Sequence, residues 1–181
     1  MGHFQAGSDS QIVQSFFVVP PDRASHHIHG GAVYWDFPGG PWVYVWPENA
    51  FLRAYRFTGG LLQTTPASTS TTTDPTGVPG GAPGMPGGML SVSADGGDAD
   101  SGLLWASHPY RENANQAVVE GVLRVYRAAD LTQELWNSKL NPARDDVGSF
   151  AKFVPPTVAG GKVYLATFSK QLHVYGLLAP E

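Results

Sequence analysis

Cysteine is absent from the 181 residues of the chain. Without thiols, the protein forms no disulfides and no iron–sulfur clusters, and it offers neither a cysteine-ligated zinc site nor a thiol nucleophile. The absence does not indicate a compartment, because a cysteine-free protein tolerates both oxidising and reducing surroundings.

Charged residues are also scarce. Asp, Glu, Lys and Arg make up 14% of the chain, against about a quarter in an average domain. The formal net charge is −4, with 11 Lys and Arg against 15 Asp and Glu. Because nucleic-acid backbones are bound by clustered cations, this balance argues against a nucleic-acid partner.

Long hydrophobic runs are missing as well. No apolar segment reaches the ~20 residues of a membrane-spanning helix, so we expect no membrane span. Residues 16–19 form a short apolar patch, but no basic segment precedes it, and the first 30 residues therefore lack a signal peptide. We expect either a cytoplasmic protein or a chain whose true N-terminus lies upstream.

Glycine, proline and aromatic residues are abundant. The chain has 22 Gly and 15 Pro, and 12% of its residues are aromatic. Together with the low charge, this composition predicts an all-β fold with many turns. No amphipathic helix of three turns is evident. The strand-like runs cover residues 31–35, 42–46, 51–57, 89–93, 102–107, 118–126, 134–136, 157–158, 162–168 and 171–175.

Two segments differ from this pattern. Residues 1–25 are weakly patterned, and Ile12, Val13 and residues 16–19 predict one edge strand. Residues 64–88 are rich first in Thr and Ser and then in Pro and Gly. Such a stretch buries too little apolar surface to offset its ordering entropy. We expect a long exposed loop inside one domain spanning residues 26–181; a linker between two domains is the alternative.

An internal repeat organises the strand-like runs. The element Leu-x-[Ala/Val]-Tyr occurs at residues 52–55, 123–126 and 172–175. A Val-Tyr pair ends eleven residues before the last tyrosine of the first and third copies, which predicts two hairpins. In the second copy, residues 103–105 take the place of that pair. Without the low-complexity loop, the copies recur every ~40–50 residues, which is typical of four-stranded β-propeller blades.

The chain resembles the PQQ-like, or quinoprotein-type, β-propeller repeat proteins over roughly residues 30–181. The resemblance depends on residues 155–166 followed by 171–175, and on residues 123–126 running into Asp130-Leu131-Thr132 and Glu134-Leu135-Trp136. The last stretch is similar to the family's tryptophan-docking element, although its Gly is absent and it is one residue shorter. The resemblance implies a partial β-propeller of about three four-stranded blades, with Trp136 buried between blades. It also implies a periplasmic or secreted location, since such relatives are usually exported.

The resemblance implies the blade fold more directly than the family's activity. Quinoprotein dehydrogenases close about eight blades around PQQ and Ca²⁺ and use a vicinal cysteine pair, which this chain lacks. We therefore expect a non-catalytic binding or interaction scaffold without a cofactor, a fragment of a longer propeller. Its expected partners are other blades, a second copy of the chain, a protein or a small anionic ligand. The alternative is the C-terminal part of a PQQ- and Ca-dependent quinoprotein dehydrogenase.

Three blades cannot close a ring, so two terminal faces should stay open. We expect these faces to present apolar side chains such as Tyr44, Trp46, Val163 and Leu165. The isolated chain is then expected to associate rather than to remain a monomer.

A histidine cluster is the first candidate for chemistry. On a strand, His27 and His29 point to the same face, and Asp36 follows nearby in the sequence. These residues predict a metal site with two imidazoles and one carboxylate. The alternative is a structural role, in which the imidazoles hydrogen-bond to loop backbone.

Two further segments offer charged groups. The aspartates of residues 95–102 resemble an oxygen-rich calcium loop, but a bidentate Glu is missing, so a solvated hairpin turn is the alternative. Arg144 and Lys152 lie in loops entering the last blade, where they could bind an anionic ligand in a central channel. Alternatively, Arg144 pairs with Asp145 or Asp146 at the surface.

Overall fold

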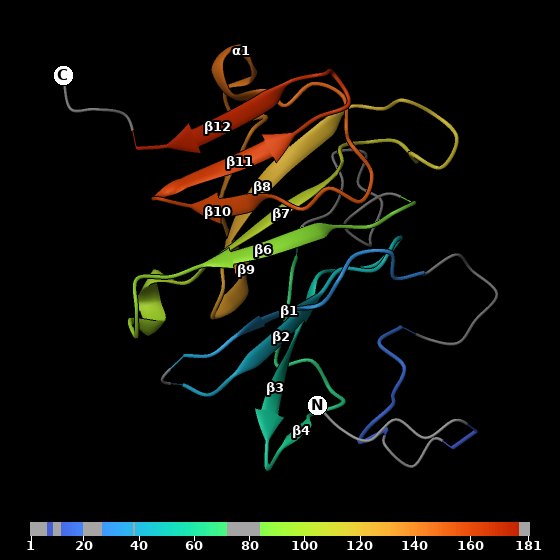
Figure 1. Ribbon diagram of the computed structural model, residues 1–181, viewed down its shortest axis with the longest axis vertical. Coiled ribbons are helices and arrows are strands. Elements are labelled where there is room, and N and C mark those ends of the chain that lie inside the picture. The colour runs from blue at the N-terminus through green and yellow to red at the C-terminus, as the bar shows by residue number, and fades with distance from the viewer. Residues whose placement is uncertain (1–6, 9–11, 20–26, 38, 72–83, 178–181) are drawn as a thin grey trace.

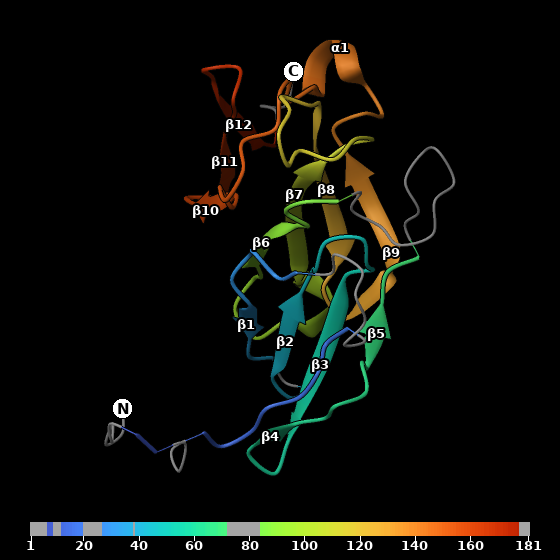
Figure 2. The same ribbon diagram turned by 90° about the vertical axis from the view of Figure 1, so that its right-hand side faces the viewer.

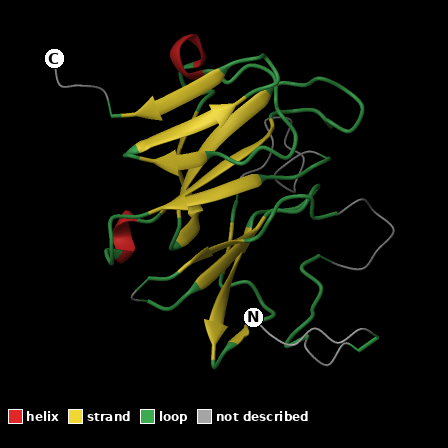
Figure 3. Ribbon diagram, in the orientation of Figure 1, coloured by secondary structure: helices red, strands yellow, loops and turns green. Residues whose placement is uncertain are grey.

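A computed structural model of the chain describes residues 7–8, 12–19, 27–37, 39–71 and 84–177. These residues form three antiparallel sheets, none of which closes on itself within the described part of the chain (Figure 1). Figure 3 shows that the only helices in this part are two short ones, a 3-10 turn at Ala99–Ser101 (η1) and α1 at Pro142–Asp145. The predicted all-β class is confirmed. None of the described helices is long and apolar enough to cross a bilayer.

The sheets follow one another along the chain. Sheet 1 contains β1 (Val33–Trp35), β2 (Trp42–Val45), β3 (Arg53–Thr58), β4 (Leu61–Leu62) and β5 (Ser68–Thr69), which pairs with β3. Sheet 2 contains β6 (Met89–Ser93), β7 (Leu103–Pro109), β8 (Gly121–Arg127) and β9 (Asp130–Asn137). Sheet 3 contains β10 (Thr157–Ala159), β11 (Lys162–Ala166) and β12 (Leu172–Gly176).

Paired glycines make two of the tight hairpins. Gly59 and Gly60 between β3 and β4 have φ of 63° and 84°, and Gly160 and Gly161 between β10 and β11 have φ of 56° and 69°. A two-residue turn with both φ values positive matches the twist of the strands it joins, and glycine adopts it without steric cost.

The registers confirm the hairpins predicted from the repeat. Val43 lies opposite Tyr55 on β2 and β3, and Val163 lies opposite Tyr175 on β11 and β12. In the second copy, Leu104 on β7 lies opposite Tyr126 on β8. The three repeat tyrosines therefore occupy the same place in three similar sheets.

The sheets stack face to face with sheet 2 in the middle (Figure 2). A buried cluster joins sheets 1 and 2, and a smaller cluster joins sheets 2 and 3. The first strands of the sheets are neighbours, because β6 contacts both β1 and β10, while β5 contacts β9 on the opposite side. The largest fully buried side chains of the first cluster include Trp46, Tyr44, Tyr126, Leu52, Leu104 and Leu131.

The N-terminal residues do not form the predicted edge strand. Residues 12–19 are described without a strand and run along β3 and β4, where the Phe16 ring packs edge-on against Tyr55 at 5.3 Å. The Gln14 side chain donates to the Leu62 carbonyl at 2.7 Å and accepts from the Leu62 amide at 2.8 Å. A side-chain amide thus pairs with the edge backbone in place of a neighbouring strand, and the segment covers the outer face of sheet 1.

The low-complexity segment 64–88 is partly built into the fold. It contains β5, and Ser70 is buried, with its Oγ accepting from the Leu52 amide at 3.2 Å. The Ser68 Oγ accepts from the Leu131 amide of sheet 2 at 2.9 Å. Residues 84 and 86–88 are buried as well. The expectation of an exposed loop is wrong for these stretches. Around β5, serine hydroxyl groups satisfy backbone donors of neighbouring strands, and Gly87 and Gly88 pack against Trp46. Residues 72–83 lie outside the described residues.

Trp136 lies where the resemblance implied, between sheets 2 and 3. Its ring packs edge-on against Tyr175 at 5.7 Å and against the cluster that contains Leu123 and Val163. The side chain is only half-buried rather than fully buried.

Trp136→Ala is expected to lower the free energy of unfolding by about 2 kcal/mol, less than the ~3–5 kcal/mol of a fully buried tryptophan, because part of the ring is already in water. Urea unfolding measures this difference. The matched control is Leu135→Ala, the adjacent residue that is 45% exposed. Equal midpoints for the two variants would show that Trp136 does not join the sheets.

Candidate functional site

The histidine cluster is completed by a residue of the turn between β2 and β3. His27 and His29 precede β1, and Glu48 lies in that turn. The Glu48 amide donates to the His27 carbonyl at 3.0 Å, and the His27 amide donates to Glu48 Oε1 at 3.2 Å. The two segments are therefore joined through their backbones beside the imidazoles.

The ligand-type atoms of the three residues converge. His27 Nδ1 lies 2.8 Å from Glu48 Oε1, and His29 Nε2 lies 3.5 Å from Glu48 Oε2. All three ligand-type atoms lie within 4.8 Å of one another, and within the described residues no other group of three His, Asp or Glu does so. The Glu48 side chain is 2% exposed, whereas that of His27 is 70% exposed. We call this group the His–Glu cluster.

Asp36 does not belong to the cluster, so this part of the predicted metal site is wrong. Asp36 follows β1, whereas His29 precedes it. Because an extended strand advances by about 3.3 Å per residue, the two residues are held apart at opposite ends of β1. The hairpin formed by β1 and β2 places Glu48 there instead. Val33 pairs with Tyr44, and this antiparallel register, continued past the strand ends, brings position 48 next to position 29.

The turn that bears Glu48 is held from several sides. Trp46 Nε1 donates to the Ala50 carbonyl at 2.8 Å, and the Gly88 amide donates to the Trp46 carbonyl at 3.1 Å. Gly87 has φ of +80°, and a Cβ there would lie 2.5 Å from the Trp46 carbonyl oxygen and 2.8 Å from the Glu48 nitrogen. Only glycine allows this approach, so the backbone under the carboxylate is packed closely.

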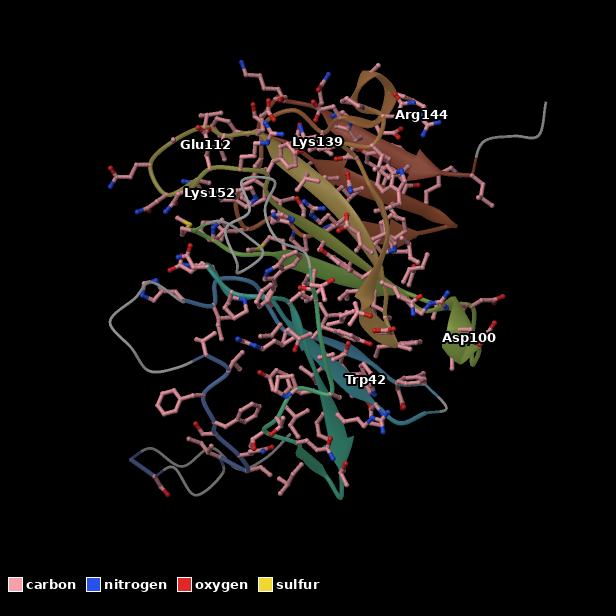
Figure 4. The ribbon with its side chains drawn as sticks, turned by 180° about the vertical axis from the view of Figure 1, so that it is seen from behind. Trp42, Asp100, Glu112, Lys139, Arg144 and Lys152 are labelled. Carbon is pink, nitrogen blue, oxygen red and sulfur yellow. The ribbon has the colours of Figure 1, made fainter. Side chains whose placement is uncertain are left out.

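Arg144 and Lys152 are not brought together. Arg144 makes a bidentate pair with Asp145, at 2.6 Å and 2.7 Å, which raises the pKa of Arg144 and lowers that of Asp145. Lys152 Nζ donates to the Asn115 carbonyl at 2.8 Å. Figure 4 shows Arg144 beside helix α1 and Lys152 well apart from it. The predicted ion pair of Arg144 is confirmed, and the shared anion site is not formed.

The aspartate-rich turn uses its oxygen atoms internally. Asp98 Oδ1 accepts from the Asp100 amide at 2.9 Å, and Ser101 Oγ accepts from the Asp95 amide at 2.8 Å. Figure 4 shows Asp100 at the edge of the molecule, in η1. The arrangement matches the solvated hairpin turn, the alternative to a calcium loop.

A network of hydrogen-bonded polar side chains crosses sheet 2, and no sequence motif indicated it. Arg124 Nε donates to His108 Nε2 at 2.9 Å, and Arg124 Nη1 donates to Glu134 Oε1 at 2.6 Å. Arginine only donates, so His108 Nε2 accepts and its proton lies on Nδ1, 2.6 Å from the Pro109 carbonyl. His108 is 1% exposed, and its burial, with Arg124 beside it, holds its pKa well below the ordinary value. His108 and Arg124 are buried, and only Glu134, whose side chain is 23% exposed, connects this network with solvent.

The outer face of sheet 3 carries exposed apolar side chains. Leu172 is 64% exposed and lies opposite Ala166, and Val174 is 53% exposed and lies opposite Tyr164. Directly opposed residues of a sheet share a face. We call these four residues the sheet 3 outer face.

The residues expected on open faces lie elsewhere. Tyr44, Trp46, Val163 and Leu165 are all buried between sheets. The expectation placed these residues on the open face, whereas they lie on the covered face. Alternation along a strand separates two faces but does not indicate which of them a neighbouring sheet covers.

No protein-family model matches the chain, and the comparisons with curated proteins and with solved structures find no significant similarity.

Proposed function

We propose that the chain is a non-catalytic binding scaffold, a three-bladed part of a PQQ-like β-propeller, and that the sheet 3 outer face is its binding surface. The proposal is supported by three antiparallel sheets stacked in chain order, with their first strands side by side. In a propeller, each blade covers its faces with its two neighbours.

The observation that carries the proposal is a difference among the repeat copies. In the first copy, Leu52 and Ala54 are both 0% exposed, packed toward sheet 2. In the second copy, Leu123 is 0% exposed, packed toward sheet 3, and Val125 is 3% exposed. Their counterparts in the third copy are Leu172 and Val174, which are more than half exposed.

The repeat tyrosines show which face of sheets 2 and 3 points toward the preceding sheet. In the second and third copies the tyrosine faces the preceding sheet, since Tyr126 packs toward sheet 1 and Tyr175 packs toward sheet 2. In the first and second copies the leucine packs toward the following sheet. Leu172 and Val174 therefore occupy the positions that a following sheet covers in the earlier copies, and we infer that a further sheet covers them too.

We propose that the sheet covering Leu172 and Val174 is sheet 3 of a second copy of the chain. The outer face of sheet 1 is crossed by residues 12–19, with Phe16 against Tyr55, so a head-to-tail contact would have to displace them. A twofold contact between two sheet 3 outer faces leaves that segment in place and closes the assembly. It also removes the exposed leucine and valine from water.

Leu172→Glu with Val174→Glu is expected to convert a dimer into a monomer, because two carboxylates per face would be buried against two others. Sedimentation equilibrium measures the mass. Both positions are exposed in the single chain, so folding is retained. The matched control is Val118→Glu, at a site 63% exposed and outside sheet 3, which should leave the dimer intact.

A wild-type chain that stays monomeric at all concentrations would overturn the second copy as occupant. Saturable binding of PQQ with Ca²⁺, followed by tryptophan fluorescence, would support the quinoprotein dehydrogenase alternative instead.

A further inference from the structure

We propose that the His–Glu cluster binds a divalent first-row transition-metal ion, with zinc as the natural test ion, through His27 Nδ1, His29 Nε2 and the Glu48 carboxylate. The inference is independent of the proposed scaffold function, since no residue of the sheet 3 outer face takes part in it.

The separations between the Glu48 oxygens and the two imidazole nitrogens are close to those around a small ion. Ligand bonds of about 2.0–2.2 Å at a tetrahedral centre put the ligand atoms roughly 3.3 Å apart. His29 Nε2 and Glu48 Oε2 are 3.5 Å apart, close to that separation. His27 Nδ1 and Glu48 Oε1 are 2.8 Å apart and must separate slightly, which the exposed His27 side chain can do.

The position of Glu48 favours a cation as well. Its carboxylate is almost fully buried, accepts from the His27 amide at 3.2 Å and lies beside both imidazoles, so it is already oriented toward the two nitrogen ligands. A divalent ion would join the three side chains. The close packing of Gly87 on the turn fixes the backbone that bears Glu48 without the ion, which lowers the ordering cost of binding.

The ligand types select the class of metal. Two imidazoles and one carboxylate suit zinc and its first-row neighbours, whereas Ca²⁺ takes oxygen ligands only. Three protein ligands leave at least one coordination position for water or an external ligand. The His27 side chain is 70% exposed, so solvent reaches the cluster, and the Phe153 ring stands 6.0 Å from the His29 ring.

Isothermal titration of the full chain with zinc chloride tests the site. We expect one zinc ion per chain at this site, and a melting temperature that rises with zinc. Glu48→Gln keeps the shape and removes the charge, and His27→Ala removes an exposed ligand without disturbing the core. Each should weaken zinc binding by at least about tenfold, since even indirect metal contacts are worth 10–100-fold.

Asp36→Asn is the matched control, because it removes the carboxylate that the sequence alone indicated. Its affinity for zinc should equal that of the wild type. If Glu48→Gln fails to fold, His27→Ala still decides the question. The proposal is overturned if the wild type does not bind zinc, or if His27→Ala binds it as tightly as the wild type.

Discussion

Trp46→Ala is expected to lower the free energy of unfolding by about 3–5 kcal/mol, the typical cost of removing a fully buried tryptophan. Trp46 is 1% exposed, and its ring lies 5.9 Å from that of Tyr126 and 4.7 Å from that of His108. These contacts join sheets 1 and 2, so the vacated space cannot be filled without moving a sheet. Chemical denaturation followed by circular dichroism measures the loss.

Two variants separate the causes of that loss. Trp46→Phe keeps an aromatic ring but removes the hydrogen bond from Nε1 to the Ala50 carbonyl, which alone is worth about 1 kcal/mol. Tyr34→Ala, on the same sheet but 54% exposed, should change stability by about 0.5 kcal/mol or less. Equal losses for Tyr34→Ala and Trp46→Ala would contradict the packing of sheet 1 on sheet 2.

Stability is expected to fall as the pH is lowered from 7.5 to 5, because His108 is buried without a proton. Burial and the neighbouring Arg124 lower the pKa of His108 well below its ordinary 6.5. Below about pH 6.5, the unfolded chain binds a proton that the folded chain does not bind. The contribution is therefore fully present above that pH and is lost as the pH falls, by about 1.4 kcal/mol per pH unit.

Urea unfolding at several pH values between 5 and 7.5 measures this dependence. Three aspartates have a pKa lowered from the ordinary 3.8, so they change protonation only below this pH range. They are Asp130, Asp145 and Asp146. His108→Gln keeps a hydrogen-bonding group beside Arg124 but does not titrate, so its stability should vary much less over the same range. A His108→Gln protein with the wild-type pH dependence would exclude His108 as the cause, whatever its absolute stability.

Much of the fold could be predicted from the sequence, because strands and hairpins depend on neighbouring residues. Turn glycines such as Gly160 and Gly161 determine where a hairpin closes, and the repeat determines the register that puts Val163 opposite Tyr175. The all-β class follows from the same patterns, whereas the inter-sheet place of Trp136 was implied by the family resemblance. The burial of Ser70 in the Thr- and Ser-rich stretch did not follow, since Ser68 and Ser70 find backbone donors on segments distant in sequence.

For the candidate sites too, some features could be predicted from the sequence and others depended on the tertiary structure. The sequence alone determined that His27 and His29 form a pair, and it indicated Arg144 as the partner of an adjacent aspartate. Only the tertiary structure decided that Glu48 rather than Asp36 completes the cluster, because a hairpin returns the chain to its start. It also decided that Leu172 and Val174, rather than Val163 and Leu165, lie on the open face. Alternation gives a strand two faces, but which face is covered depends on the neighbouring sheet.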